Sequence, residues 1–331
     1  MRLPPEAIQA LIPKEEPSFI DPIRFSQTES ISDGLLRNSY LWAYALLNGF
    51  GTGLFFRPHF LSPRIYRRLP LRTVHLSAGF VYINPQTAER ISSDFPISNS
   101  FVFGLYALAT ADDQDKLQEV IPIRYPGRTI PLVINYGRIG LHGCPPHPAG
   151  GMNSCWVENA SGGTRWSKGI LASRHVVSGY SLGSSINLTP STAHFLPSSG
   201  KLADIDACTI DAAVIGIDPI DWPPGLRRLS VNRAIAPGTT TGAFTDSTGI
   251  ITSGSVLRVI HNSTYYGNLI GQRVITDFYG KPGDSGTLLR DGAGDGMGIY
   301  IGDIPDGAGG KEGLFQDLYQ AKHYFGLDLY Y

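Results

Sequence analysis

Ser285 lies in the run Gly-Asp-Ser-Gly at residues 283–286, and this run constrains the fold of the chain more than any other feature. Glycines on both sides of a serine let the backbone turn sharply and direct its N–H groups at one point. Apolar residues follow at 288–289, so we expect a tight turn that enters a buried strand. A serine hydroxyl in such a turn is a good nucleophile only when a base and an oxyanion site surround it.

A histidine and an aspartate that would complete such a site occur upstream in strand-like contexts. His175 closely follows the run Gly-Ile-Leu-Ala at residues 169–172, which is typical of a buried strand. Asp211 opens the apolar run at residues 212–217. An acid in that position tends to be buried, and a buried acid needs a partner such as an imidazole. We therefore expect both side chains to approach Ser285.

Together, the three passages resemble the trypsin-like serine peptidases of the chymotrypsin fold, in their microbial form, whose catalytic residues follow the same order of His, Asp and Ser. The resemblance extends over about residues 130–331. It implies a mainly β fold, a chymotrypsin-like double β-barrel of two six-stranded barrels with a C-terminal helix, preceded by a smaller α/β N-terminal domain. The expected division is residues 1–125 for the N-terminal domain and residues 126–331 for the peptidase domain.

The resemblance implies a role for each residue of the site. Ser285 would attack a peptide carbonyl, and His175 would take up the proton and return it to the leaving amine. Asp211 would hold the imidazole in the right tautomer. The backbone N–H groups of Gly283 and Ser285 would form the oxyanion hole.

The acid has two competitors in the sequence. Asp204 and Asp206 lie a few residues upstream of Asp211, and they share one face if that stretch is extended. The resemblance favours Asp211 because Ala-Ala-Val-Ile follows it directly, as in the motif of the family.

The turn around the serine departs from the family pattern. Thr287 stands where a second glycine is commonest, and Lys281-Pro282 brings a proline close to the oxyanion turn. Asp284 resembles the buried acid of the family, but residues 1–125 precede the domain, so an amino terminus cut just before the domain cannot pair with it. A serine endopeptidase regulated by its N-terminal domain is the leading hypothesis. A catalytically inactive protease-fold binding module is the alternative, and a protease that cuts itself or a partner protein is a third reading.

The resemblance also suggests a pocket for the substrate side chain that precedes the cut. Tyr279 would lie at its floor, and Lys281 would bias it towards acidic side chains. The later strand would supply the wall, with Tyr300 and Gly302. Loop geometry that moves Tyr279 out of the pocket is an equal alternative.

Charge and hydropathy argue against nucleic acids and membranes as binding partners. The net charge of −1 gives no electrostatic reason to expect a nucleic acid or an acidic membrane surface. Residues 1–16 lack the pattern of a secretory signal, and the uncharged run at 40–56 is too short and too rich in glycine for a membrane span. We expect a buried helix at about residues 35–48 and a cytoplasmic protein. Its partners would be a protein or peptide substrate and a regulatory protein bound through residues 1–125.

The cysteines do not suggest a disulfide framework. There are three of them, and without a signal segment they fit a reducing compartment, although Cys144 and Cys155 could pair in an exported protein. His142 and His147 lie near the same cysteines, but the spacing matches no standard zinc motif. We expect no metal and no cofactor.

The two ends of the chain also carry secondary-structure signals. Runs of β-forming residues at 73–76 and 101–106 predict strands in the N-terminal part. Near the C-terminus, apolar residues recur at helical spacing, which predicts a closing helix over residues 312–325 with an apolar docking face.

Overall fold

The computed structural model describes residues 73–83, 87–88, 101–109, 118–125, 128–137, 140–141, 153–162, 166–188, 199–205, 210–233, 235, 238, 240–260, 263–265, 268–270 and 273–331. The predicted helix at residues 35–48 lies outside these residues, as do His142, Cys144, His147 and Asp206. Strands dominate the described part, with one α-helix and short 3-10 turns.

Six strands form a closed ring, called the closed barrel below. Their order is β11 (Thr241–Thr245), β16 (Leu288–Asp291), β17 (Gly296–Pro305), β18 (Lys311–Asp317), β15 (Arg273–Thr276) and β12 (Ile251–Ile260). The ring closes because β12 also pairs with β11, with Gly242 opposite Gly254. An aromatic cluster fills it, in which the Tyr300 ring stacks on Phe244 at 5.5 Å between ring centroids.

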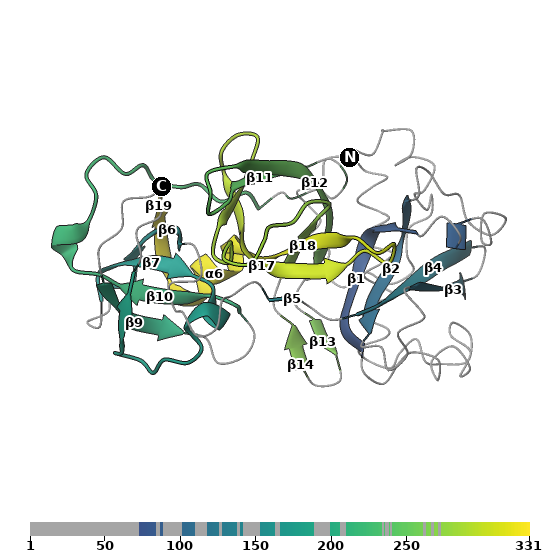
Figure 1. Ribbon diagram of the computed structural model, residues 1–331, viewed down its shortest axis with the longest axis horizontal. Coiled ribbons are helices and arrows are strands. Elements are labelled where there is room, and N and C mark those ends of the chain that lie inside the picture. The colour runs from purple at the N-terminus through teal and green to yellow at the C-terminus, as the bar shows by residue number, and fades with distance from the viewer. Residues whose placement is uncertain are drawn as a thin grey trace.

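Six further strands form a separate sheet, called the six-stranded sheet below. Their order is β19 (Leu327–Tyr330), β6 (Asn153–Asn159), β7 (Lys168–Ala172), β10 (Ala213–Gly216), β9 (Ser199–Ile205) and β8 (Ser185–Asn187). Figure 1 shows this sheet at one end of the molecule, next to the closed barrel. The chain runs from β18 of the closed barrel through one helix to β19 of this sheet, so its C-terminal segment connects the two sets of strands.

The N-terminal strands continue the sheet of the closed barrel on its other side. Their order outward from β12 is β1 (Thr73–Tyr82), β2 (Phe101–Ala109), β4 (Arg128–Tyr136) and β3 (Gln118–Tyr125), called the N-terminal sheet below. β1 joins β12 where Gly79 faces Arg258. The expected domain division between residues 125 and 126 falls inside the hairpin of β3 and β4, and it stays a prediction.

Three short elements complete the described strands. β13 (Ser263–Tyr265) and β14 (Asn268–Ile270) form a hairpin of their own. β5 (Gly140–Leu141) pairs with β17. The 3-10 turns are η2 (Arg174–Val177) and η3 (Pro219–Asp221).

The interface between the six-stranded sheet and the closed barrel is apolar. Its buried cluster takes Leu171 and Val214 from the six-stranded sheet and Leu288 and Ile299 from the closed barrel. Burial of such side chains contributes about 1.5–3 kcal/mol each. This interface therefore holds the segments that precede His175 and follow Ser285 in a fixed relation.

The predicted closing helix is correct only in its second half. The α-helix α6 spans Leu318–Phe325, whereas the residues before it form the strand β18. β18 is required as a strand because it pairs with β15 on one side and β17 on the other. The Asp317 side chain then accepts a hydrogen bond from the Gln320 N–H at 2.7 Å, which caps the start of α6.

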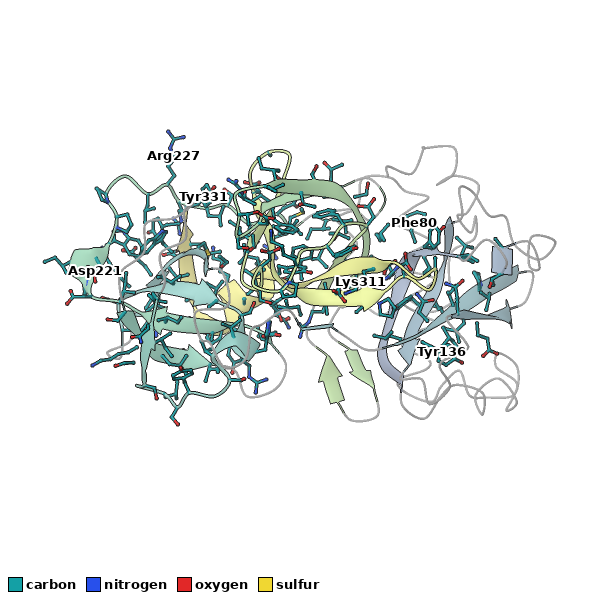
Figure 2. All side chains as sticks on the ribbon, in the orientation of Figure 1. Phe80, Tyr136, Asp221, Arg227, Lys311 and Tyr331 are labelled. Atoms are coloured by element: carbon teal, nitrogen blue, oxygen red, sulfur yellow. The ribbon has the colours of Figure 1, made fainter. Side chains whose placement is uncertain are left out.

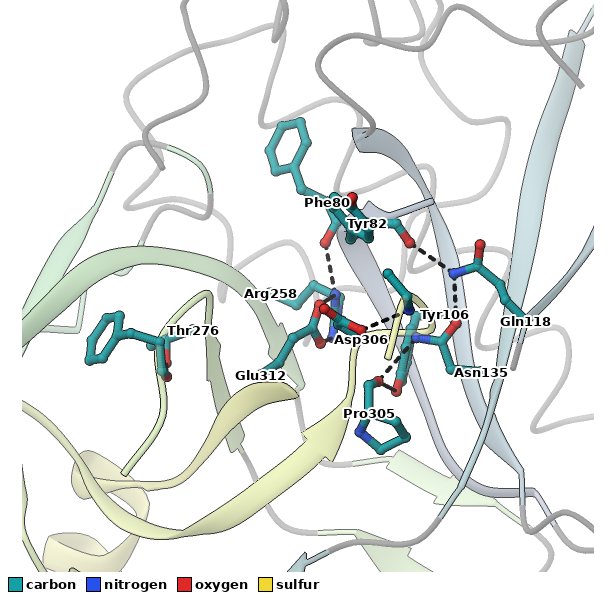
Figure 3. Close-up of polar contacts among 12 residues, drawn as sticks. Phe80, Tyr82, Tyr106, Gln118, Asn135, Arg258, Thr276, Pro305, Asp306 and Glu312 are labelled. Carbon is teal, nitrogen blue, oxygen red and sulfur yellow. Dashed lines mark hydrogen bonds and ion pairs between the residues drawn. The ribbon is translucent and has the colours of Figure 1, made fainter. Parts of the chain in front are cut away.

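The junction between the closed barrel and the N-terminal sheet holds a buried ion pair. Arg258 of β12 is fully buried and pairs with Glu312 of β18, which is 2% exposed (Figure 3). The guanidinium also donates to the Phe80 carbonyl oxygen of β1 at 2.8 Å and lies over the Tyr106 ring of β2, 4.2 Å from its centroid. Figure 2 shows Phe80 on the N-terminal sheet and Lys311 on the closed barrel. The N-terminal sheet thus completes the burial of this charge.

Candidate active site

The turn that carries His175 is fixed at both of its ends. Strand β7 ends at Ala172, and η2 begins at Arg174, so His175 lies directly beyond a buried strand. Ser173, between them, is fully buried and donates its hydroxyl to the Tyr300 carbonyl oxygen at 3.0 Å. That bond ties the start of η2 to the closed barrel.

The structure brings His175, Asp211 and Ser285 together. The Nδ1 atom of His175 lies 2.9 Å from Asp211 Oδ2, and its Nε2 atom lies 2.9 Å from Ser285 Oγ. A carboxylate can only accept hydrogen bonds, so Nδ1 is the donor to Asp211, and in the neutral ring Nε2 is then the acceptor that faces the serine hydroxyl. This is the tautomer in which an imidazole can take a proton from the serine.

Asp211 holds the backbone of His175 as well as its ring. The His175 N–H donates to Asp211 Oδ1 at 3.0 Å, and the Asp211 N–H donates to the Gln316 side-chain oxygen at 2.8 Å. Burial works to raise the pKa of Asp211, but the hydrogen bonds and charge of His175 outweigh it and hold that pKa below its usual value. The carboxylate therefore stays ionised beside the imidazole.

The alternative acids are placed differently. Asp204 lies on β9, and its Oδ1 accepts from the neighbouring Ile205 N–H at 2.9 Å. Asp206 is outside the described residues. Of the described aspartates, it is Asp211 that contacts the His175 ring.

The turn at Ser285 has the conformation that its glycines allow. Gly283 and Gly286 have φ values of +99° and +98°, a region that side chains with a Cβ rarely occupy. The Gly286 N–H donates to the Tyr300 carbonyl oxygen at 2.7 Å, and the Tyr300 N–H donates to the Thr287 carbonyl oxygen at 2.9 Å. The turn is thus fastened to β17. Thr287 fits beside it, with its hydroxyl on the Asp284 carbonyl oxygen.

Two N–H groups of this turn have no hydrogen-bond acceptor in the described part of the chain. Among the residues that the structure describes, none accepts a hydrogen bond from the N–H of Gly283 or of Ser285. The Asp284 N–H between them is used within the turn, by the Lys281 carbonyl oxygen at 3.0 Å. Two unpaired donors in one turn match the requirement of an oxyanion hole.

The buried Asp284 takes its hydrogen bonds from backbone amides. It is fully buried, and its two oxygens accept from the Ser247 N–H at 3.0 Å and the Lys281 N–H at 2.8 Å. The sequence signalled Asp284 but not Ser247, because a backbone amide has no side-chain signature. The nearby Asp246 organises that loop, since its Oδ1 accepts from the Ile250 N–H at 2.8 Å. No new amino terminus is needed to pair with Asp284.

The predicted pocket residues have separate surroundings. The Tyr279 side chain is 45% exposed, and its ring lies 5.9 Å from the Lys311 ammonium. The Lys281 ammonium lies 2.8 Å from Asp246. The Tyr300 ring is buried in the aromatic cluster, where it stacks on Phe244 and meets Phe315 edge to face, and its role in a pocket stays a prediction. Gly302 is paired with Leu141 of β5.

A cavity of about 940 Å³ lies elsewhere. Residues of the six-stranded sheet and its loops line it, among them Trp166, Leu182 and Lys201. None of the predicted site residues lines this cavity. In the described part of the chain, no group of three or more His, Cys, Asp or Glu side chains is arranged to hold a metal ion.

Comparisons with known proteins give one kind of match. No family model matches the sequence, and no curated protein matches it. The solved structures that resemble the chain are chymotrypsin-like serine proteases. A Nocardiopsis protease has 18% identity and a TM-score of 0.40, over 54% of this chain and 92% of that one. Thermobifida fusca protease A has 18% identity and a TM-score of 0.39, over 54% and 89%.

A third solved structure is similar to the same degree. The chymotrypsin of Cellulomonas bogoriensis has 18% identity and a TM-score of 0.36, over 53% of this chain and 95% of that one. Such values describe a likeness of fold and carry no information on the reaction. The predicted mainly β fold with a C-terminal helix agrees with the described strands and with α6. In the described ranges, none of the helices has the length and apolar character needed to cross a bilayer.

Proposed function

We propose that this protein is a serine endopeptidase that hydrolyses peptide bonds through an acyl-enzyme intermediate. The observation that carries the proposal is the position of one imidazole between two partners, 2.9 Å from Asp211 on one side and 2.9 Å from Ser285 on the other. A turn serine without a catalytic role has no need of a histidine that is itself oriented by a partly buried carboxylate.

The proposed reaction begins with attack of Ser285 Oγ on the carbonyl carbon of the peptide. His175 Nε2 takes the hydroxyl proton, and Asp211 stabilises the imidazolium that results. The N–H groups of Gly283 and Ser285 bind the oxyanion, and the loss of one such donor costs about 10²–10³ in rate in comparable enzymes.

The intermediate then breaks down in two stages. His175 gives its proton to the leaving amine, the C–N bond breaks, and the acyl group remains on Ser285. Water then attacks the ester with His175 again acting as the base. The two peptide ends leave, and the serine regains its proton.

The first test is labelling by a fluorophosphonate, which reacts only with an activated serine. We expect the full chain to be labelled and both Ser285→Ala and His175→Ala to lose the label. Ser178→Ala is a matched control, because this exposed serine donates only to the His175 carbonyl oxygen. Wild-type chain that is folded but stays unlabelled would indicate the inactive binding module instead.

A further inference from the structure

The backbone of Asp211 is anchored to the closed barrel by a side chain. Asp211 lies two residues before β10, outside the paired residues of that strand. Its N–H donates to the side-chain oxygen of Gln316 in β18 at 2.8 Å, across a separation of 105 positions in the sequence. The turn of Ser285 is fastened to the same barrel through β17. The acid and the serine of the candidate site are therefore referred to one set of strands.

Gln316 is held firmly within the closed barrel. β18 runs between β15 and β17, and Gln316 is paired with Arg273 on one side and Ile299 on the other. Its neighbour Phe315 lies in the aromatic cluster inside the barrel, so Gln316 points to the outer face, as alternate residues of a strand do. Gln316 is fully buried there. The side chain thus reaches Asp211 from a rigid base.

The hydrogen bonds of the Gln316 amide fix its orientation. Its oxygen accepts from the Asp211 N–H and from the Arg273 guanidinium. Its nitrogen donates to the Gln320 side-chain oxygen at 3.1 Å. A reversed amide would set its N–H donors against the donors of Asp211 and Arg273. Arg273 therefore helps to determine that the amide oxygen, and not the nitrogen, faces Asp211.

The interface between the two strand systems needs such directional bonds. The hydrophobic effect is non-directional, so its buried aliphatic side chains bring the two systems together without aiming a polar group. A hydrogen bond is directional, and a buried donor that loses its acceptor costs stability. One bond of this kind runs from Ser173 to the Tyr300 carbonyl oxygen and holds the segment of His175. The bond from Asp211 to Gln316 does the same for the acid.

Arg273 also acts on Asp211 through its charge. Burial works to raise the pKa of Asp211, whereas the hydrogen bonds and charge of His175, and after them the charge of Arg273, lower it. The charged groups that act on this carboxylate are thus His175 of η2 and Arg273 of β15. The guanidinium favours the ionised acid in addition to orienting the amide.

We propose that Gln316 is a positioning residue of the active site, and that its amide, oriented by Arg273, holds Asp211 in register with His175 across the two strand systems. The proposal rests on the proposed function, and it adds a residue that acts on the reaction through another side chain. Loss of this anchor lets Asp211 shift relative to the imidazole, and a misplacement of about 1 Å costs up to about a hundredfold in rate.

The test compares Gln316→Met with Gln316→Glu in the full chain. Both keep the length of the side chain, but only glutamate keeps an oxygen that accepts from Asp211 and Arg273. Fluorophosphonate labelling should slow about ten- to a hundredfold in Gln316→Met and stay close to the wild-type rate in Gln316→Glu. Packing alone predicts the opposite order, because methionine is easier to bury than a carboxylate. A wild-type rate in Gln316→Met, or equal losses in both variants, overturns the proposal.

Gln320→Met is the matched control, because Gln320 binds the nitrogen at the other end of the same amide. It should be labelled at the wild-type rate, and a loss as large as that of Gln316→Met would contradict the assignment. Melting temperatures show which variants are folded. If Gln316→Met does not fold, Arg273→Met takes its place, because it leaves Gln316 intact and removes a donor that orients the amide. Its labelling should be slower than that of wild type, and an unchanged rate counts against the proposal.

A proton resonance separates failure of this inference from failure of the proposed function. In a chain with isotope-labelled histidine, the Nδ1 proton of His175 is identified by its absence from His175→Ala. Its resonance should be sharp in wild type and Gln316→Glu, and broadened or lost in Gln316→Met, because the proton exchanges with water once Asp211 shifts.

The two measurements together distinguish the outcomes. Wild type that shows the resonance but is not labelled contradicts the endopeptidase, and the resonance of Gln316→Met then decides the positioning. Wild type that is labelled, with Gln316→Met unchanged in both measurements, overturns the positioning and leaves the endopeptidase standing. Wild type that lacks both the resonance and the label overturns both proposals.

Discussion

The closed barrel meets its two neighbours at two junctions, and each junction holds a carboxylate beside a basic side chain. At the junction with the six-stranded sheet, Asp211 faces His175, and the two side chains keep 16% and 13% of their surface exposed. At the junction with the N-terminal sheet, Glu312 faces Arg258, with 2% and 0% exposed. The same kind of pair thus occurs once with access to solvent and once without.

The two carboxylates respond to their surroundings in opposite directions. For Glu312 burial dominates and raises the pKa in spite of Arg258. For Asp211 burial also acts to raise the pKa, but the hydrogen bonds from His175 prevail and lower it. The difference shows that a carboxylate stays ionised where hydrogen bonds from its partner outweigh burial, and that the neutral form is favoured where burial dominates.

The largest expected effect tests the chemical side of this comparison. Asp211→Asn should reduce the rate of fluorophosphonate labelling about 10⁴-fold, because an amide stabilises the wrong imidazole tautomer. The melting temperature should change little, since the hydrogen-bond geometry is retained. Asp204→Asn is the matched control and should label at the wild-type rate. Similar rates for Asp211→Asn and wild type would remove the chemical role of Asp211.

The second effect tests the architectural side. Arg258→Met should lower the free energy of unfolding by about 3–5 kcal/mol, because it leaves Glu312 buried without its partner. The double variant Arg258→Met with Glu312→Leu should recover most of that loss. Denaturant titration measures both. A single variant as stable as the double one would show that Glu312 is not buried as an ion.

The third effect is a dependence of stability on pH, and it arises from Asp317, the residue between β18 and α6. Burial raises the pKa of Asp317 to about 7 from an ordinary value of 3.8. The folded state therefore favours the protonated form of Asp317. The contribution of this protonation to the free energy of unfolding is fully present below about pH 3.8 and is lost as the pH rises through about 7. Asp317→Asn keeps an oxygen for the Gln320 N–H and cannot ionise.

The measurement is the difference in melting temperature between this variant and wild type across that window. The melting temperature of the variant, relative to that of wild type, should rise by about 2–5 °C from the acidic end of the window to the alkaline end. A constant difference would mean that Asp317 does not titrate in this range, and that its contribution is the helix cap alone.

The smallest expected effect compares an ion pair that has an exposed lysine with the two pairs at the junctions. Lys281 is 47% exposed and lies 2.8 Å from Asp246. Lys281→Met should change the free energy of unfolding by less than about 1 kcal/mol. Labelling should persist, because the Lys281 backbone N–H still donates to Asp284. A large loss of labelling would show that the side chain, and not the amide, holds the loop of Ser247.

The meeting of His175, Asp211 and Ser285 was predictable because each carries its own local signal. Each lies beside an apolar strand run or between glycines, and the segment around it shows this without reference to the rest of the chain. The sequence also predicted strands at 73–76 and 101–106, which lie in β1 and β2. The catalytic roles of His175, Asp211 and Ser285 stay a prediction until labelling is measured.

The features that the sequence did not reveal are those made by partners far along the chain. The amide of Ser247 and the side chain of Gln316 reach the site from loops and strands with no motif of their own. β5 is two residues long, too short for a pattern. The apolar residues from 312 onward recur at helical spacing, but residues 312–317 form a strand because they pair with β15 and β17.

The bond from Arg258 to the Phe80 carbonyl joins residues 178 positions apart, and this separation bears on how the molecule is made. Contacts between such distant segments form slowly, because the chain must first close a long loop. Both segments belong to one chain, so closure of this loop is intramolecular, and the rate of folding should not depend on protein concentration.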